Sequence, residues 1–273
     1  PIATSRMRGD TERATDLDDL LDRMETHDDD YRYSVAWIDL VSRRHRGRSV
    51  LTRGDHAELD ELSPIARRDA LAYDPAPLAS VPPVVPTGAL NIATVSAFNE
   101  AWYRRHPVHR VGEVQSIPAF FHPLDGVHHW NRIYGRRGFL QYQFVVPFGA
   151  EETLRRIVHD IADARMPSFL AVLKRFGEGN AGHLSFPMAG WTLALDIPAG
   201  AHDLEPLLMS FDERVAAEGG RVYFAKDSRL DARMVPRMYP RLDEWRAVRD
   251  RLDPDGALTS DLDRRLDLTG HRR

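Results

Sequence analysis

Hydrophobic residues recur along this chain with two periods, one typical of helices and one typical of strands. Apolar positions three and four residues apart predict helices over residues 16–26, 151–164, 203–217 and 241–252. Runs of β-branched, aromatic and aliphatic residues predict strands over residues 31–40, 49–52, 139–146, 168–173, 192–197 and 221–224. This irregular order favours an α+β domain in which helices cover a largely antiparallel sheet.

Two local features refine this pattern. Thr15 followed by Asp18 resembles a capping box at the start of the first helix. A stretch without charged residues runs from Pro75 to Asn99, and its prolines exclude a continuous helix or a central strand. Long loops are usually functional lids or disordered linkers, and this one is too apolar for a solvated linker. We interpret it as a lid over about residues 75–110; the alternative is a loop packed on the core.

Composition excludes several classes of function. A net charge of -4 gives no overall electrostatic case for nucleic-acid binding. The absence of cysteine excludes disulfides and thiolate sites, and no His/Asp/Glu set has metal-ligand spacing, so no metal site is predicted. No apolar run approaches the roughly 20 residues of a membrane span. The N-terminus has no signal-peptide pattern, and because it opens on Pro1 we expect a processed or truncated product.

Polar residues within apolar strands are the first candidates for chemistry. Gln141 and Gln143 share one face of the strand over residues 139–146, while Tyr142 faces the other side. Paired amides suit polyol hydroxyls, because each amide offers a donor and an acceptor. The same alternation also describes the solvent face of a half-exposed strand, and periodicity leaves both interpretations open.

Two lysines stand at the ends of predicted strands. Lys174 ends SFLAVLK, and Lys226 follows RVYFA. Either lysine alone is typical of a surface residue whose stem lies along apolar surface. Two converging lysines would instead hold an anionic substrate, and a lysine near a reacting hydroxyl can take part in proton transfer.

A histidine and several aromatic residues complete the candidates. His122 directly precedes a proline, which favours an extended or turn conformation. The aromatic side chains fit either a core or a surface for a sugar ring or prenyl chain. They are Trp37, Phe121, Trp130 and Tyr134.

Several longer strings occur in a recognisable order along nearly the whole chain. They include FFHPLDG, WNRIYG, GFLQYQFVVP, KRFG, LSFP, GGRVYFAKDSR and SDLDRRL. Together they resemble the C-terminal part of the decaprenylphosphoryl-β-D-ribose 2'-oxidase family, within the vanillyl-alcohol oxidase/aldonolactone oxidase superfamily. The first 30 residues and the proline-rich stretch match only loosely.

The resemblance implies a domain organisation. FAD is expected in an N-terminal domain that this chain lacks, in keeping with the absence of a G-x-G-x-x-G or P-loop motif. Residues 1–228 are expected to form the substrate-binding cap domain. Residues 229–273 are expected to return to the FAD domain, which would leave helices here with an uncovered apolar face.

The resemblance also implies roles for single residues. Gln141, Gln143, Lys174 and Lys226 match pocket positions, and Tyr223 matches a flavin contact. We expect Lys226 to lie nearest the reacting centre, Gln143 to orient the sugar and Lys174 to neutralise a phosphate.

Further substrate-side positions follow from the same strings. Phe121 matches an aromatic position that is commonly tyrosine, and His122 follows it. Trp37 and Trp130 match other pocket-side aromatics. Ala194 stands where the family often has the cysteine that nitroaromatic inhibitors attack, so turnover is expected to survive there.

The implied reaction transfers a hydride from C2' of a polyprenyl-phosphate-linked ribosyl unit to the flavin. A partner reductase would convert the resulting keto sugar to the arabinose epimer for cell-wall arabinan. The lipid substrate implies contact with a membrane surface and a place in the cell envelope, membrane-associated or on the periplasmic face, with the cytoplasm as the alternative. Other hypotheses are an aldonolactone or alditol oxidase and a substrate-binding module that is inactive alone.

Overall fold

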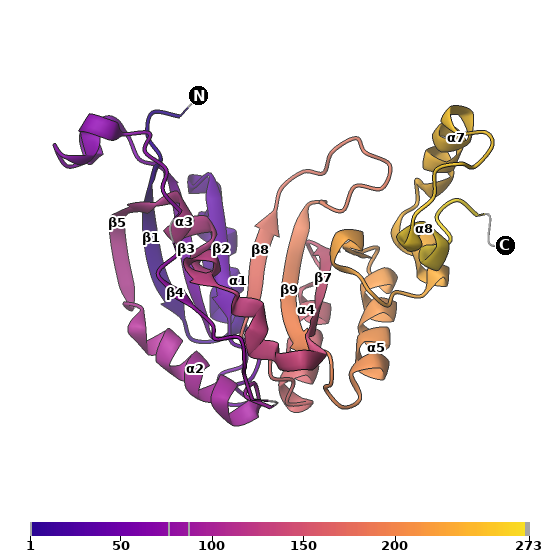
Figure 1. Ribbon diagram of the computed structural model, residues 1–273, viewed down its shortest axis with the longest axis horizontal. Coiled ribbons are helices and arrows are strands. Elements are labelled where there is room, and N and C mark those ends of the chain that lie inside the picture. The colour runs from indigo at the N-terminus through magenta and orange to yellow at the C-terminus, as the bar shows by residue number, and fades with distance from the viewer. Residues whose placement is uncertain (1, 76, 87, 271–273) are drawn as a thin grey trace. The chain divides into compact units, whose positions relative to one another are not determined.

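The structure is a computed structural model that describes residues 2–75, 77–86 and 88–270 (Figure 1). Pro1, Ala76, Thr87 and residues 271–273 lie outside these ranges, and so does the prediction made on Pro1. The chain divides into two compact units. The first is Pro1–Phe139, Val158–Lys174 and Asp196–Gly200, and the second is Leu140–Ile157, Arg175–Leu195 and Ala201–Arg273.

An antiparallel sheet with strand order β8-β2-β3-β1-β5 forms the centre of the first unit. Its strands are β1 (Arg6–Ala14), β2 (Tyr33–Ile38), β3 (Ser49–His56), β5 (His109–Ser116) and β8 (Ala171–Phe176). A small parallel pair joins β4 (Ala79–Ser80) to β6 (Val127–His128). The predicted strand over 49–52 therefore extends to His56, and that over 168–173 begins at Ala171.

Strand β1 was not predicted, because charged residues interrupt its sequence RMRGDTERA. Glu12 on this strand is buried, and its carboxylate pairs with Arg53 of β3 and with Arg23. A buried carboxylate that is paired in this way can occupy an inward position that an apolar residue would otherwise fill. Binary patterning alone could not identify such a strand.

Three α-helices belong to the first unit, namely α1 (Leu17–His27), α2 (Ile92–Arg105) and α3 (Ile117–Phe121). Helix α1 buries the apolar face that its helical period predicts, formed by Leu17, Leu20, Leu21 and Met24. Its N-cap is Asp16, whose carboxylate accepts the N–H of Asp19 at 3.0 Å. The predicted capping box of Thr15 with Asp18 is wrong by one residue, because Thr15 pairs with Asp19.

The proline-rich stretch is shorter as a loop than predicted. The prolines end at Pro86, and Asn91 then caps α2 by accepting the N–H groups of Ala93 and Thr94 at 2.9 and 3.1 Å. Leu90, Ile92 and Val95 pack on an aromatic cluster of the first unit. Residues 92–105 are therefore a packed helix, which corrects the loop expected as far as Asn99.

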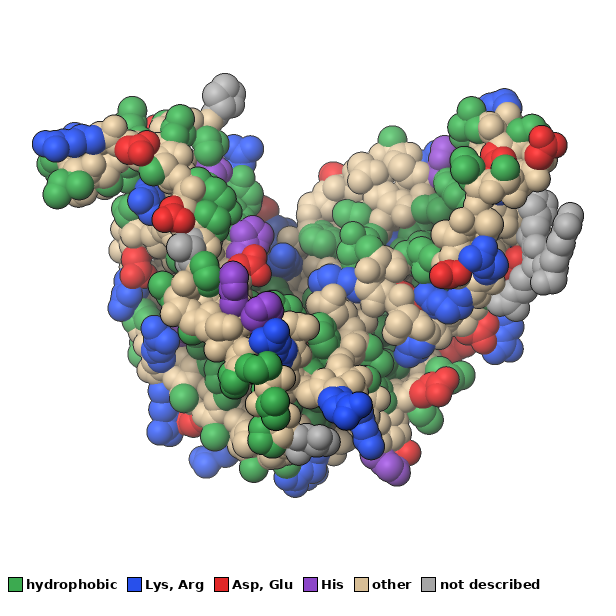
Figure 2. All heavy atoms as spheres, viewed as in Figure 1, with side chains coloured by type: hydrophobic (Ala, Val, Ile, Leu, Met, Phe, Trp, Pro, Cys, Tyr) green, Lys and Arg blue, Asp and Glu red, His purple; other side chains and the backbone are tan. Residues whose placement is uncertain are grey.

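Apolar side chains remain exposed in the segment that precedes α2. Leu78 and Val84 are 94% and 82% exposed, and Ile65, Leu71 and Tyr73 are exposed further upstream. Figure 2 shows hydrophobic side chains on the projection at the upper left, where Figure 1 places residues near 60–70. Such exposed apolar residues in a loop are typical of a surface that meets a partner.

We expect limited proteolysis to cut first within residues 77–86 and to spare residues 92–105. Amide groups in the first range have few ladder hydrogen bonds, whereas α2 is hydrogen-bonded and packed. Mass spectrometry of the early fragments would locate the cuts. Early cleavage inside α2, with the preceding segment intact, would contradict this assignment.

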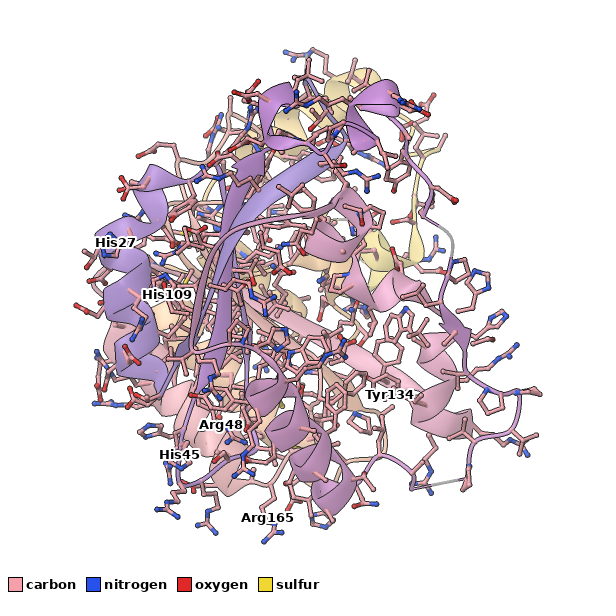
Figure 3. The ribbon with its side chains drawn as sticks, turned by 90° about the vertical axis from the view of Figure 1, so that its left-hand side faces the viewer. His27, His45, Arg48, His109, Tyr134 and Arg165 are labelled. Carbon is pink, nitrogen blue, oxygen red and sulfur yellow. The ribbon has the colours of Figure 1, made fainter. Side chains whose placement is uncertain are left out.

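A buried ion pair ties the second half of α2 and the β2–β3 connection together in the first unit. Asp39 is 1% exposed, and its carboxylate accepts Nε of Arg48 at 2.8 Å and Nδ2 of Asn99 at 2.7 Å. The same carboxylate accepts the backbone N–H of Val41 at 3.0 Å. Arg48, labelled in Figure 3, also pairs with Glu100 at 2.6 Å.

Strand β5 lies at the edge of the first unit's sheet. Its pairing with β1 shifts register between Gly9 and Thr11, which marks a bulge. The N–H of Gly112, which has a φ of 69°, donates to the carboxylate of Asp10 at 2.7 Å. Glycine suits this position because its backbone enters the left-handed region without strain.

The second unit contains the strand order β10-β7-β9, with β7 (Phe139–Pro147), β9 (Gly190–Pro198) and β10 (Arg221–Val222). Its helices are α4 (Glu151–Asp163), α5 (Leu204–Ala217), α6 (Val235–Met238), α7 (Leu242–Leu252) and α8 (Asp261–Leu266). Strands β7, β8 and β9 and helix α4 contribute residues to both units. The predicted α+β class with a largely antiparallel sheet and helices is confirmed.

Two glycines allow β7 to pack closely between its neighbours. A Cβ atom on Gly190 would lie 2.0 Å from the carbonyl oxygen of Val146, and one on Gly220 would lie 2.3 Å from that of Val145. Cβ atoms do not approach backbone oxygens so closely, so only glycine fits at either place. These contacts bring the residues that follow β10 beside the middle of β7.

The C-terminal segment packs within the second unit. Leu230, Val235, Met238 and Leu266 are buried, whereas Leu252 is 78% exposed. The proposed division at residues 228 and 229, with the later part resting on another domain, stays a prediction.

Candidate functional site

Gln143 is a buried polar residue in the middle of β7. Its Nε2 donates to Oγ1 of Thr192 on β9 at 3.0 Å, and Thr192 donates in turn to the carbonyl of Phe144 at 2.9 Å. Gln143 therefore does not lie on a solvent face. Sequence reasoning missed Thr192, although its place in an apolar strand marks it as a polar residue that needs a partner.

The opposite face of β7 carries a separate polar network. As predicted, Tyr142 points away from Gln143, and its hydroxyl donates to the carboxylate of Asp212 on α5 at 2.9 Å. Arg229 pairs with the same carboxylate. Burial raises the pKa of Tyr142 well above its usual range and also raises the pKa of Asp212. This face is structural, because its polar atoms are used within the protein.

A backbone hydrogen bond joins two predicted site residues. The N–H of Tyr223 donates to the carbonyl of Gln143 at 2.9 Å, which continues the pairing of β10 with β7. The Tyr223 ring stacks on Phe186 with centroids 4.6 Å apart, and Phe186 meets Phe176 edge to face. Tyr223 is half-buried, and part of its surface remains exposed.

Lys226 lies in a short turn of 3-10 helix, Phe224–Lys226, rather than directly after a strand. The strand predicted to Phe224 ends at Val222, because the chain turns after Tyr223 and the N–H of Lys226 donates to the Tyr223 carbonyl at 3.1 Å. Lys226 is half-buried, and no residue within the described ranges forms a hydrogen bond or ion pair with its Nζ. This ammonium is therefore available to a ligand.

Three further positions in the second unit complete the set. Ala194 lies two residues after Thr192 on β9 and so faces the same side as Thr192. Gln141, half-buried, lies two residues before Gln143 on β7 and shares its face. Arg221 is half-buried, donates to the carbonyl of Ser185 at 2.8 Å, and has a pKa lowered by burial.

The first unit holds two predicted aromatic residues in one connected set of rings. Nε1 of Trp37 donates to the carbonyl of Phe169 at 3.1 Å, and Phe169 contacts Tyr134 with centroids 5.7 Å apart. Trp130 packs beside Tyr134, which is labelled in Figure 3, and beside Phe139 at 5.5 Å. Both tryptophans keep part of their surface exposed, so the core and ligand interpretations remain compatible.

The other predicted residues of the first unit lie on separate elements. Phe121 is 37% exposed at the end of α3 and meets Tyr33 edge to face at 4.9 Å, and His122 beside it is exposed. Lys174 is exposed and lies inside β8, not at the end of its strand as expected. The pocket roles of these three residues stay predictions.

The described residues fit FAD only in part. The half-buried ring of Tyr223, backed by Phe186, offers one packing surface to a flat ring system such as isoalloxazine. The sequence contains no glycine-rich loop of the kind that holds a diphosphate. Within residues 2–75, 77–86 and 88–270, no group of three His, Asp or Glu side chains is placed to hold a metal ion.

Four buried or bonded tyrosines make stability sensitive to high pH. A hydrogen bond to Asp10 raises the pKa of Tyr31 to about 12, and burial raises the pKa of Tyr134, Tyr142 and Tyr239. Folding favours the neutral phenols, so the free energy of unfolding should hold below pH ~10 and fall as pH rises through 12. As pH is raised, the absorbance of ionised tyrosine and the circular dichroism signal of the fold should change over the same pH range. Ionisation of all 8 tyrosines near pH 10 with the fold intact would contradict this.

Comparison with known proteins finds a matching family and several similar proteins. The D-arabinono-1,4-lactone oxidase family matches residues 198–266. Decaprenylphosphoryl-beta-D-ribose oxidase of Mycolicibacterium smegmatis is 44% identical over 241 residues, 87% of this chain and 52% of that protein. An uncharacterized protein in the mprA 5' region of Streptomyces coelicolor is 38% identical over 276 residues, 98% of this chain and 74% of that protein.

Among solved structures, 6-hydroxy-D-nicotine oxidase from Arthrobacter nicotinovorans is similar with a TM-score of 0.43 and 16% identity, covering 92% of this chain and 53% of that one. A likeness of this size has no bearing on function. The chain spans about half the length of the Mycolicibacterium relative. No helix in the described part of the chain is long and apolar enough to cross a membrane.

Proposed function

Because the chain belongs to the family of FAD-linked oxidases that includes decaprenylphosphoryl-β-D-ribose oxidase, we propose that it is the substrate-binding part of such an oxidoreductase. The proposed substrate is a polyprenylphosphoryl-ribose, oxidised at its 2'-hydroxyl to an arabinan precursor for the cell wall. The hydrogen bond from Tyr223 to Gln143 carries this proposal. It brings an amide suited to sugar hydroxyls, an aromatic ring suited to the flavin, and the Lys226 turn into one part of the second unit.

The chain's own residues can bind and orient the sugar. Gln143 is held by Thr192, so its remaining amide positions have a fixed direction toward a hydroxyl. Lys226 Nζ can donate to the reacting 2'-oxygen and stabilise it while the hydroxyl proton passes to solvent water. FAD, when bound, supplies the hydride acceptor. Lys174 contributes positive charge for the phosphate.

The proposed partners follow from the chemistry of the substrate. A polyprenyl chain would reach the protein from a membrane surface, and the exposed apolar residues from Ile65 to Val84 suit contact with such a chain. The keto product requires a separate reductase to give the epimeric alcohol. On this basis we propose a location at the cell envelope, with the cytoplasm as the alternative.

The deciding experiment uses the protein expressed from the complete gene. Supplied with FAD and an electron acceptor, it should oxidise a polyprenylphosphoryl-ribose, and mass spectrometry should show a product lighter by two hydrogens. Deuterium at C2' should slow the reaction if hydride transfer limits the rate. Absence of turnover in a protein that retains FAD would refute the proposal.

A soluble aldonolactone is the second candidate substrate, favoured by the match of residues 198–266 to D-arabinono-1,4-lactone oxidase. The same preparation should be tested with D-arabinono-1,4-lactone and with an alditol. A higher kcat/KM for the lactone than for the lipid-linked sugar would select this alternative. The two substrates differ in the apolar tail, so a detergent-matched control is needed.

We expect residues 1–273, purified alone, to be colourless and to bind FAD weakly. Tyr223 provides a ring contact, but the sequence has no phosphate-binding loop to hold the diphosphate. Visible absorbance of the purified chain and titration with FAD would measure this. A yellow preparation with stoichiometric flavin would contradict the expectation.

A further inference from the structure

The turn that follows Lys226 is built around one buried carboxylate. The side chain of Asp227 is 3% exposed. Its Oδ1 accepts the backbone N–H groups of Arg229 at 3.0 Å and Leu230 at 2.8 Å. These bonds fix the backbone over residues 227–230, directly after the lysine that the proposed function places at the reacting hydroxyl.

Arg265 of α8 holds the same turn from another part of the chain. Its Nη2 forms an ion pair with Oδ2 of Asp227 at 2.7 Å and donates to the Asp227 carbonyl at 3.2 Å. Its Nη1 donates to the carbonyl of Leu230 at 3.3 Å. One planar guanidinium therefore contacts both ends of the turn, which a lysine ammonium could not do with the same geometry.

Helix α8 is held in place by contacts of its own, so the position of Arg265 is fixed. Leu266 is fully buried next to Arg265. Arg246 of α7 donates to the carbonyls of Leu268 at 2.7 Å and Asp267 at 2.9 Å. The backbone just after α8 is thus tied to α7, and the guanidinium of Arg265 has little freedom to leave the turn.

A second ion pair connects the same turn to the sheet. Arg229 pairs with Asp212, which also accepts the hydroxyl of Tyr142 on β7. The turn is therefore tied to the strand that carries Gln143. In contrast, Lys226 Nζ has no hydrogen-bond or ion-pair partner among the described residues, so its direction depends on the backbone of this turn and on the packing of its half-buried stem.

From this arrangement we propose that Arg265 is a positioning residue for Lys226, a role that rests on the proposed function. A lysine side chain is flexible, and a displacement of about 1 Å in a reacting group can cost about 100-fold in rate. Loss of Arg265 leaves the Asp227 carboxylate buried without its cation, and the turn should loosen. The consequence is a lower kcat with little change in substrate binding.

The test compares R265Q and R265K with R264Q in the protein from the complete gene. Arg264 is the matched control, because it is the neighbouring arginine of α8, is 60% exposed, and pairs with Asp261 on its own helix. We expect R265Q to lower kcat by about 10- to 100-fold, with KM changed less than about 3-fold and R264Q unchanged. R265K should recover part of the loss.

Two further measurements separate positioning from a general loss of structure. In the unliganded protein, the amides of Arg229 and Leu230 should exchange hydrogen faster in R265Q, while amides of β1 and β3 should not. In a K226A background, R265Q should have almost no additional effect on kcat, because the two act through one group. Faster exchange with unchanged kcat, or an equal loss of kcat with and without Lys226, would overturn the proposal. An inactive wild-type protein would instead refute the proposed function. Unchanged amide exchange in R265Q would be enough to refute the claim that Arg265 holds the turn.

Discussion

Replacing Lys226 by alanine in the protein from the complete gene is expected to lower kcat by about 10²- to 10³-fold, the loss typical of a removed donor to developing negative charge. Lys226 follows Tyr223 by one turn, and its Nζ is available for a ligand. The reacting oxygen gains charge only as the hydroxyl loses its proton, so the contact should strengthen in the transition state. KM should change little.

Lys174→Ala is the matched comparison. Lys174 is exposed on β8, and its proposed contact with a phosphate is the same before and during the reaction. Its loss should therefore raise KM on the order of tenfold and leave kcat nearly unchanged. Steady-state kinetics with measured flavin content would separate the two variants. A K226A protein that binds flavin and keeps the wild-type kcat would show that the reacting centre lies elsewhere.

Asp39→Ala is expected to lower the free energy of unfolding by about 3–5 kcal/mol, because Arg48 loses its buried partner and keeps only Glu100, which is 38% exposed. Arg48 is 9% exposed at its side chain, and Asp39 is its most buried partner. Asn99 and the N–H of Val41 lose their acceptor as well. The second half of α2 and the β2–β3 connection should loosen together.

Asp163→Ala serves as the control for the loss of a carboxylate that pairs with arginines but is not buried. Asp163 also meets two arginines, Arg43 and Arg46, but it is 43% exposed, so its loss should cost less than about 1 kcal/mol. Asp39→Asn should fall between the two, since an amide oxygen keeps one acceptor. Denaturant unfolding curves would rank the variants. Equal midpoints for Asp39→Ala and Asp163→Ala would contradict a stabilising role for the buried pair.

Much of the fold could be predicted from the sequence where apolar period and turn residues agree. Helices α1, α4, α5 and α7 were each predicted to within one residue at either end. Strand β1 escaped detection because its inward Glu12 is paired with Arg53, a partner that lies far along the sequence. Helix α2 was not predicted, because the prolines before it led us to expect a loop as far as Asn99. Asn91, which follows the last proline, is nevertheless a helix-capping signal.

The candidate site was predictable only in its residue types. The strings around Gln143, Tyr223 and Lys226 indicated pocket residues, and the structure adds the backbone bond between Gln143 and Tyr223. Thr192 and Arg265 were not singled out, because their importance depends on contacts between distant segments. Such contacts, including Arg265 with Asp227, leave no period in a single sequence.

The irregular edge strand β5 has a consequence for how the chain behaves at high concentration. Val111 and Val114 are exposed there, and Val108 is exposed just before the strand, whose outer N–H and C=O groups could pair with another chain and start amyloid-like stacking. The bulge opposite Asp10, with the positive φ of Gly112, breaks the regular spacing that such pairing needs. The ion pair of Arg110 with Glu113 adds charge along the same edge. The strand is thus shielded against self-templated growth by its own backbone geometry.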